Sequence, residues 1–218
     1  MQWALLAGVP EEELRTILQV ARRRSFARNE VVFHRGDPAD CLHLIARGRF
    51  AIRIMTPLGD TATVAIRGPG ATFGEMALLS DEVKRTATVA AVEDGETYSV
   101  YQTDFDLIRA SYPGADRFLW SLLVNELHVM NERLLEALYL PVDKRVRRRL
   151  VELAELYGDG GGGVVTVPLT QEVIAELSGA GRPTVNQVLR EEAKRGTIEL
   201  ERGRIRILDT AELARRAR

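Results

Sequence analysis

One short segment of the chain, FGEMALLSDEVKRTATV at residues 73–89, combines side chains that suit an anion and its sugar. Gly74 allows backbone to come close to a ligand, and the first N–H groups of a helix that starts after it would point toward an anion. Arg85 supplies a planar guanidinium for phosphate oxygens, and Thr86 adds a hydroxyl. Glu75 only accepts hydrogen bonds when ionised, so it suits a ribose 2′-hydroxyl. The spacing therefore indicates a buried cyclic phosphate with its ribose.

The same segment resembles the phosphate-binding cassette of cyclic-nucleotide-binding domains. The alternative is an amphipathic helix, a turn and a strand that carry a surface glutamate and arginine. We expect the short cassette helix over residues 75–79. The resemblance implies ribose and phosphate contacts at Gly74, Glu75, Arg85 and Thr86, with Met76 and Ala77 beside them.

Short strand-like runs broken by glycines fill the chain from Phe26 to about Tyr101. Examples are CLHLIARG, RFAIRIM and TYSVY, with turn residues between the runs. This pattern predicts an antiparallel roll or barrel. It is similar to the β-roll of cyclic-nucleotide-binding domains, so we expect the first domain to span residues 1–114.

A long helix is predicted over residues 115–138, which contain no proline or glycine. Its apolar residues recur at steps of three and four, which is the heptad pattern of a helix that pairs with another helix. Packing on its own domain is the alternative. We assign residues 115–139 to a dimerisation helix, and its apolar seam consists of Trp120, Leu123, Leu127, Met130, Leu134 and Ala137.

The resemblance to cyclic-nucleotide-binding regulators implies that this helix forms the homodimer axis and closes over the nucleotide. Met130 and Asn131 align with the pair that meets the base, although Met130 departs from the small hydroxyl residues common there. Asn131 can both donate and accept, which suits the amino group and N7 of adenine, or it can flip to meet O6 of guanine. A hydroxyl at Thr86 is also compatible with cyclic GMP. Cyclic AMP is the expected ligand, and cyclic GMP stays open.

Leu140-Pro141-Val142-Asp143 breaks the helical pattern and predicts a hinge at residues 140–143. A new helix should follow over residues 144–157. Its KRVRRR run is either a solvated surface or a contact with phosphate.

Two short helices around a glycine-bearing turn are predicted within residues 169–194. Gly179 supplies the turn, and Pro183 is tolerated in the first turn of the second helix. The following TIELERGRIRIL predicts a hairpin around Gly203. The pattern resembles a winged helix-turn-helix, so we assign residues 144–218 to a DNA-binding domain.

This second resemblance carries a set of predicted DNA contacts. Arg182 is the best candidate to read guanine through O6 and N7. The best-known receptor of this kind has an acidic base-contacting residue at the position of Pro183 and a basic one at the position of Gln187. The DNA half-site of this chain is therefore expected to differ from the half-site of that receptor. The predicted DNA-binding residues are Thr170, Gln171, Arg182, Thr184, Asn186, Gln187 and Arg190.

In this order of parts, the chain resembles transcription regulators of the cyclic-AMP receptor protein and fumarate-nitrate regulator (Crp/Fnr) superfamily, notably its actinobacterial members. The implied fold is α+β, with an N-terminal β-roll, a long dimerisation helix and a C-terminal winged helix-turn-helix. The implied partners are a cyclic nucleotide, a second copy of the chain, a palindromic double-stranded operator and RNA polymerase.

Composition excludes several other classes. The chain has 218 residues, 45% hydrophobic and 28% charged, and no apolar run long enough for a membrane span. Acidic residues stand near its start where a signal peptide needs bases, so we expect a cytoplasmic protein. With one cysteine and three histidines, Cys41, His34, His43 and His128, and no metal-ligand spacing, no metal site is expected.

Charge is uneven along the chain, whose net charge is -1. From Val142 onward 15 Lys and Arg stand against 12 Asp and Glu, a modest excess that fits a polyanion or an ordinary solvated surface.

No catalytic motif is present, so an enzyme is not expected. A nucleotide-binding subunit that docks on a kinase is another alternative, but such a subunit does not require a helix-turn-helix. The remaining alternatives are a sensor of another small ligand in the same superfamily and a regulator that acts without nucleotide.

Overall fold

The computed structural model describes residues 15, 18–56, 59–78, 84–111, 114–159 and 163–218. Two compact units divide the chain, residues 1–129 and residues 130–218, and each is described by itself. Both helices and strands are present, so the predicted α+β class is confirmed.

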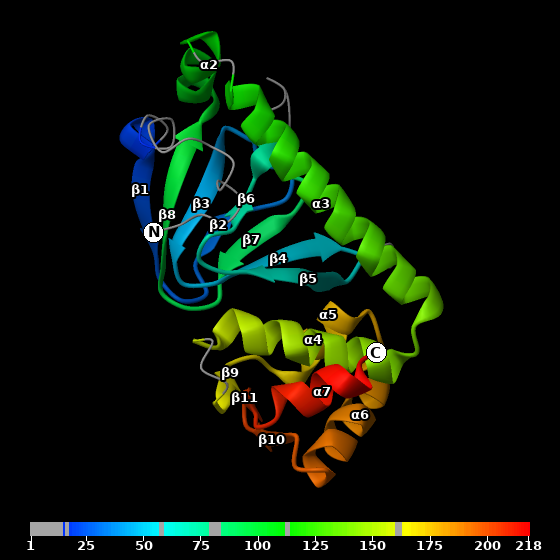
Figure 1. Ribbon diagram of the computed structural model, residues 1–218. Coiled ribbons are helices and arrows are strands. Elements are labelled where there is room, and N and C mark those ends of the chain that lie inside the picture. The colour runs from blue at the N-terminus through cyan, green and yellow to red at the C-terminus, as the bar shows by residue number, and fades with distance from the viewer. Residues whose placement is uncertain (1–14, 16–17, 57–58, 79–83, 112–113, 160–162) are drawn as a thin grey trace. The chain divides into compact units, whose positions relative to one another are not determined.

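Among the residues that the structure describes, the first unit contains two four-stranded antiparallel sheets (Figure 1). One has the strand order β1-β8-β3-β6 and the other β2-β7-β4-β5. The strands are β1 (Arg22–Phe26), β2 (Val31–Phe33), β3 (Cys41–Arg47), β4 (Phe50–Met55), β5 (Thr61–Arg67), β6 (Thr72–Phe73), β7 (Thr88–Ala91) and β8 (Gly95–Tyr101). The predicted roll is thus present, with β1 and β6 as strands that the sequence pattern did not indicate.

Apolar side chains from both sheets make the core of this unit. Phe50 and Phe73 pack with their ring centroids 5.3 Å apart. A second cluster includes Leu42, Leu44 and Phe105, the last from helix α2 (Gln102–Ser111). This core holds β3 and β6 in place, and the candidate ligand site lies beside them.

The cassette helix is a single 3-10 turn, η2 (Glu75–Leu78), directly after β6. The predicted helix extended to Leu79, which lies outside the described residues. The carbonyl of Gly74 accepts a hydrogen bond from the N–H of Ala77 at 3.1 Å, which closes the turn.

The long helix α3 spans Gly114–Tyr139, in agreement with the prediction of 115–138. Its apolar seam is open to solvent in the single chain: Trp120, Leu127, Met130 and Leu134 are each more than half exposed. The boundary between the two compact units falls inside this helix, after Val129.

The described part of the second unit contains the end of α3, four further helices and a three-stranded sheet (Figure 1). Helix α4 (Val142–Tyr157) follows the turn at Pro141, so it begins two residues before the predicted start at 144 and includes Val142 and Asp143 of the predicted hinge. The sheet has the order β10-β11-β9, from β9 (Val165–Val167), β10 (Ile198–Glu201) and β11 (Arg204–Ile207). Helices α5 (Gln171–Ser178), α6 (Arg182–Lys194) and α7 (Thr210–Arg216) complete it.

The predicted helix-turn-helix and hairpin are both observed. Thr170 caps α5 by accepting a hydrogen bond from the N–H of Val173, and Gly179 ends α5 with φ of 57°, a left-handed conformation that glycine adopts at little cost. Strands β10 and β11 pair antiparallel around Gly203. Helix α7 was not predicted from the sequence.

Candidate functional site

Arg85 is a buried cation of the first unit, with its side chain 4% exposed. Its Nη1 donates to the carbonyl of Cys41 at 2.8 Å and to that of Gly74 at 3.3 Å. Its Nη2 donates to Oδ1 of Asp40 at 3.0 Å. The guanidinium lies over the ring of Phe33, 4.0 Å from the centroid. These contacts fix the orientation of the guanidinium.

One N–H of this arginine has no protein partner: Nε of Arg85 is buried and makes no hydrogen bond. A buried donor without an acceptor is costly, and a phosphate oxygen is a suitable acceptor for it. The group therefore fits the chemistry of an anion site.

Gly74 is required by this arrangement. Its φ is +82°, and a Cβ at this position would lie 2.6 Å from Nη1 of Arg85. Any larger residue would displace the guanidinium.

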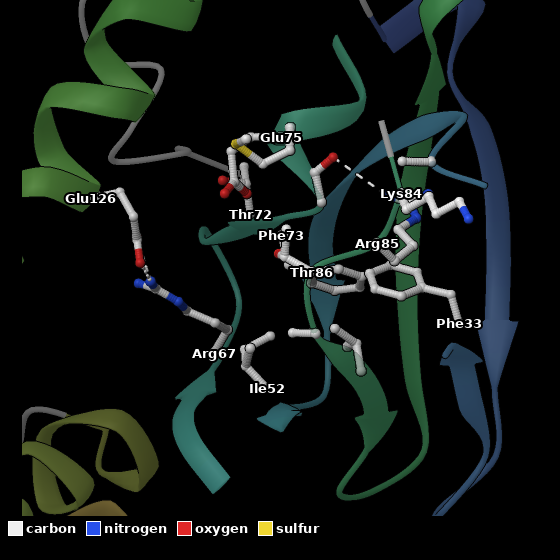
Figure 2. Close-up of a pocket in the computed structure, with 15 residues that line it drawn as sticks. Phe33, Ile52, Arg67, Thr72, Phe73, Glu75, Lys84, Arg85, Thr86 and Glu126 are labelled. Atoms are coloured by element: carbon white, nitrogen blue, oxygen red, sulfur yellow. Dashed lines mark hydrogen bonds and ion pairs between the residues drawn. The ribbon is translucent and has the colours of Figure 1, made fainter. Parts of the chain in front are cut away.

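A cavity of about 90 Å³ opens beside Arg85 (Figure 2). In Figure 2 the labelled side chains of Arg85 and Phe33 lie at one side, and those of Arg67 and Glu126 lie at the other. The lining also includes the apolar residues Ile52 and Val89.

The wall opposite Arg85 is an ion pair between strand β5 and helix α3. Nη2 of Arg67 donates to both carboxylate oxygens of Glu126, at 2.8 and 2.6 Å. Burial raises the pKa of Glu75, and the negative charge of Glu126 raises it further. A hydrogen bond with the backbone of Glu75 itself lowers this pKa. The charges of Arg67 and Arg85 also lower this pKa.

Five of the predicted ligand residues come together around this cavity: Gly74, Glu75, Met76, Arg85 and Thr86. The side chain of Ala77 is fully buried and is not part of the lining. Met130 and Asn131 are exposed on the portion of α3 that belongs to the second unit. Their contact with a base stays a prediction.

The exposed face of α6 carries most of the predicted DNA contacts. Positions 182, 186, 190 and 194 are four apart and share one side of the helix, so Arg182, Asn186, Arg190 and Lys194 line one surface. The opposite side is buried through Val185, Val188, Leu189 and Glu192.

Local contacts on this face are few among the residues that the structure describes. Nε2 of Gln187 donates to Oε1 of Glu191 at 3.2 Å, and Arg182 and Arg190 are exposed. Thr184 is exposed, and Gln171 is the first residue of α5. This face is basic through Arg182, Arg190 and Lys194, a charge that suits contact with a polyanion.

The basic run of α4 is mostly neither a solvated surface nor an open phosphate contact. Arg147 and Arg149 are buried, 5% and 2% exposed. Arg147 pairs with Asp143 and Glu192, and Arg149 pairs with Glu136 and Glu152. Arg148 is partly exposed and pairs with Glu136.

Sequence reasoning missed Phe33, Arg67 and Glu126 in the lining of the pocket, and Asp40 as a partner of Arg85. No local pattern marks them, because each is brought to the site by sheet or helix packing over a long stretch of chain. For the arginines in α4, Asp143 and Glu152 stand at helix spacing from Arg147 and Arg149, but Glu192 and Glu136 have no local signal in the sequence.

Within the described ranges, no group of three or more His, Cys, Asp or Glu side chains could hold a metal ion. In the same residues no helix combines the length and the apolar character that crossing a bilayer requires.

Comparison with known proteins agrees with both halves of this description. The family profile of the cyclic nucleotide-binding domain matches residues 23–112, and that of the Crp-like helix-turn-helix domain matches residues 144–216. The cassette and the cavity lie within the first match, and α4 to α7 lie within the second.

Full-length relatives are similar along the whole chain. The CRP-like cAMP-activated global transcriptional regulator of Mycobacterium tuberculosis is 34% identical over 98% of this chain and 96% of its own. The cyclic AMP receptor protein of Thermus thermophilus is 31% identical over 96% of this chain and 94% of its own. A solved CRP-family transcriptional regulator, also from Thermus thermophilus, is similar in fold, with a TM-score of 0.73, 25% identity and coverage of 89% and 96%.

Proposed function

Because this chain belongs to the Crp/Fnr family of transcription regulators, we propose that it is a homodimer whose affinity for DNA is controlled by cyclic AMP. The observation that carries the proposal is the pocket at Arg85, which has a buried guanidinium, an unpartnered Nε and a glycine that admits no side chain. The names of the relatives from Mycobacterium tuberculosis and Thermus thermophilus support cyclic AMP as the nucleotide.

In this proposal Arg85 and Thr86 bind the cyclic phosphate and Glu75 accepts the ribose 2′-hydroxyl. Gly74 lets the phosphate approach the backbone, and Met76 packs beside the ligand. Asn131, with Met130, would meet the base when α3 closes the site.

Dimer formation is supported by the open seam of α3. Four large apolar side chains of the seam are more than half exposed in the single chain, and a second copy of the helix would cover them. We expect the joint change of Leu127 and Leu134 to lysine to give monomers. Light scattering checks this, and an unchanged dimer mass would place the interface elsewhere.

Each protomer would place α6 in a major groove, with half-sites about 34 Å apart on a palindromic operator. Arg182 and Arg190 face outward on α6 and can reach base edges or phosphates. Contact with RNA polymerase is part of the same proposal and rests on family resemblance. Nucleotide can tighten DNA binding only if it binds the DNA-competent arrangement better than the other.

Footprinting with and without cyclic AMP tests the proposal, on duplexes selected from a random library by the nucleotide-bound protein. We expect paired protected half-sites that strengthen with cyclic AMP, and calorimetry should show cyclic AMP binding in preference to cyclic GMP. Absence of sequence-selective protection in both states would reject the DNA-binding function. Equal protection in both states would reject control by nucleotide and favour a regulator that acts without it.

A further inference from the structure

A second arginine, Arg67 on β5, lines the cavity on the side away from Arg85 (Figure 2). Its Nη2 donates to both carboxylate oxygens of Glu126. Among the described residues Arg67 makes hydrogen bonds through Nη2 alone, so its Nε and Nη1 can donate to a further acceptor. The guanidinium is thus held at the cavity by one carboxylate and has donors left for another.

The pair of Arg67 with Glu126 is the part of the lining that can rearrange at small cost. Their side chains are 24% and 38% exposed, and ion pairs that reach solvent contribute little to stability. The cavity holds about 90 Å³, well below the ~300 Å³ at which small-ligand pockets usually begin. Room for a nucleotide therefore requires side chains of the lining to move, and this pair is far more exposed than Arg85.

The carboxylate of Glu75 lines the same cavity and responds to both members of the pair. Burial raises the pKa of Glu75, the charge of Glu126 raises it further, and the charges of Arg67 and Arg85 lower it. Arg67 therefore favours the ionised form of Glu75, which only accepts hydrogen bonds, and Glu126 opposes that form.

The charges around the cavity leave one cation for this carboxylate. Among the described residues the charged side chains of the lining are Arg67, Glu75, Lys84, Arg85 and Glu126. A cyclic phosphate bound at Arg85 would occupy that guanidinium, and Lys84 is exposed to solvent. Because a carboxylate that a ligand shields from water needs a cation beside it, Arg67 is the group that can serve Glu75.

We propose that Arg67 is a positioning residue for ribose recognition, which turns from Glu126 to Glu75 and holds the Glu75 carboxylate toward the 2′-hydroxyl. Glu126 competes for the same guanidinium and so opposes ligand binding. Selectivity for ribose over deoxyribose then depends on a residue of β5 that lies outside the segment 73–89. The inference rests on the proposed function, in which Glu75 accepts the ribose 2′-hydroxyl.

The two members of the pair are changed separately, as Arg67→Met and Glu126→Gln. The control is Arg28→Met, which makes the same change at an exposed arginine of the same unit. For each full-length protein, calorimetry measures the dissociation constants of cyclic AMP and of 2′-deoxy cyclic AMP. The ratio of the second constant to the first is the ribose selectivity, and thermal unfolding shows that each variant is folded.

We expect a selectivity of about 10- to 100-fold in the parent, the range for a hydrogen bond to a charged group. Arg67→Met should reduce it to about threefold or less, because Glu75 without its cation and facing Glu126 is a weaker acceptor. The loss should fall on cyclic AMP more than on 2′-deoxy cyclic AMP. Glu126→Gln should keep the selectivity of the parent and bind both nucleotides at least as tightly, and Arg28→Met should match the parent.

A selectivity in Arg67→Met equal to that of the parent would overturn the proposal. Equal losses of affinity in Arg67→Met and Glu126→Gln would also overturn it, since the pair would then serve only to hold α3 against β5. Failure of the proposed function gives a different result, in which the parent binds neither nucleotide, and the inference would then be rejected with it.

Discussion

The two units of this chain bury arginine in different ways. In the part of the first unit that the structure describes, Arg85 pairs with one carboxylate, that of Asp40, whose side chain is 63% exposed. In the second unit Arg147 and Arg149 each pair with two carboxylates. Arg85 and Arg149 each have a buried Nε without a hydrogen-bond partner, so this feature does not separate the two units. What differs is that Arg85 lines a cavity and pairs with one exposed carboxylate, which leaves it able to bind an anion, whereas Arg147 and Arg149 each lie between two carboxylates and hold helices together. In the proposed function, the same residue type serves ligand binding in one unit and holds helices together in the other.

The pocket arginine also differs in what surrounds it. Arg85 stacks on Phe33 and donates to backbone carbonyls, which orient it without neutralising its charge. The α4 arginines are oriented by the carboxylates that neutralise them. Removal of a partner should consequently cost stability in the second unit, and removal of the arginine should cost ligand affinity in the first.

The largest expected effect is on stability, at the buried glutamate of α6. Replacing Glu192 with Leu leaves Arg147 with Asp143 alone and should lower the free energy of unfolding by about 3–5 kcal/mol. Scanning calorimetry of the full chain measures this as a lower Tm. The double variant with Arg147→Met should recover most of the loss, because the buried guanidinium is removed with its partner, and Arg216, which also pairs with Glu192, is 22% exposed. A Glu192→Leu protein as stable as the parent would show that these pairs do not hold the unit together.

Next in size is the effect of Arg85→Leu on nucleotide affinity. Loss of a desolvated charge-assisted contact costs about 2–5 kcal/mol, so cyclic AMP binding should weaken by at least roughly 30-fold. Calorimetry measures it, with Arg35→Leu as control because Arg35 is an exposed arginine of the same unit. Equal affinities of the Arg85 variant and the parent would place the phosphate elsewhere.

The sequence predicted those features that rest on local patterns. The 3-4 apolar spacing located α3 to within one residue at each end. Gly179 and Thr170 marked the turn and the start of α5, because their conformational and capping roles act within a few residues. The cassette residues were recognisable for the same reason, since Gly74, Glu75, Arg85 and Thr86 lie within thirteen positions of one another.

What could not be predicted from the sequence depends on contacts between distant positions. Asp40 meets Arg85 across 45 residues, and Arg67 meets Glu126 across 59. Arg147 and Glu192 are likewise 45 residues apart. For this reason the sequence could not show whether the basic run on α4 is solvated, contacts phosphate or is buried in ion pairs. Such pairs follow from how sheets and helices pack, and a single sequence carries no periodic signal for them.

A third expected effect is a pH dependence of the first unit's stability. His43 is buried, close to Thr97 at 3.0 Å and Ser99 at 3.1 Å, and stacks on Phe73. Burial, with the charges of Arg85 and Arg24, lowers the pKa of His43 to about 3. The unfolded chain takes up a proton near its ordinary value of about 6.5, and the folded chain does not. Stability should therefore fall as pH falls below about 6.5, by up to about 1.4 kcal/mol per pH unit.

Urea unfolding at pH 7, 6 and 5 measures this slope. His43→Gln keeps polar atoms near Thr97 and Ser99 and cannot titrate, so its slope should be smaller than that of the parent. His34→Gln is the control, because His34 is exposed. Identical slopes for the parent and the His43 variant would assign the acid sensitivity to other groups.

The smallest expected effect concerns the carboxylate of Asp40, the one that Arg85 pairs with among the described residues. It tests directly whether the pocket arginine, unlike those of α4, is free to bind an anion. Oδ1 of Asp40 accepts from Nη2 at 3.0 Å, so an incoming phosphate must compete with it. The carbonyls of Cys41 and Gly74 and the ring of Phe33 orient the guanidinium without help from Asp40. Asp40→Asn should therefore tighten cyclic AMP binding, and since exposed pairs are worth up to about 1 kcal/mol, the gain should be about fivefold at most. Calorimetry beside Asp60→Asn, an exposed aspartate of the same unit, separates this effect from the change in net charge. Weaker binding by the Asp40 variant would mean that the aspartate positions Arg85 for the phosphate instead of competing with it.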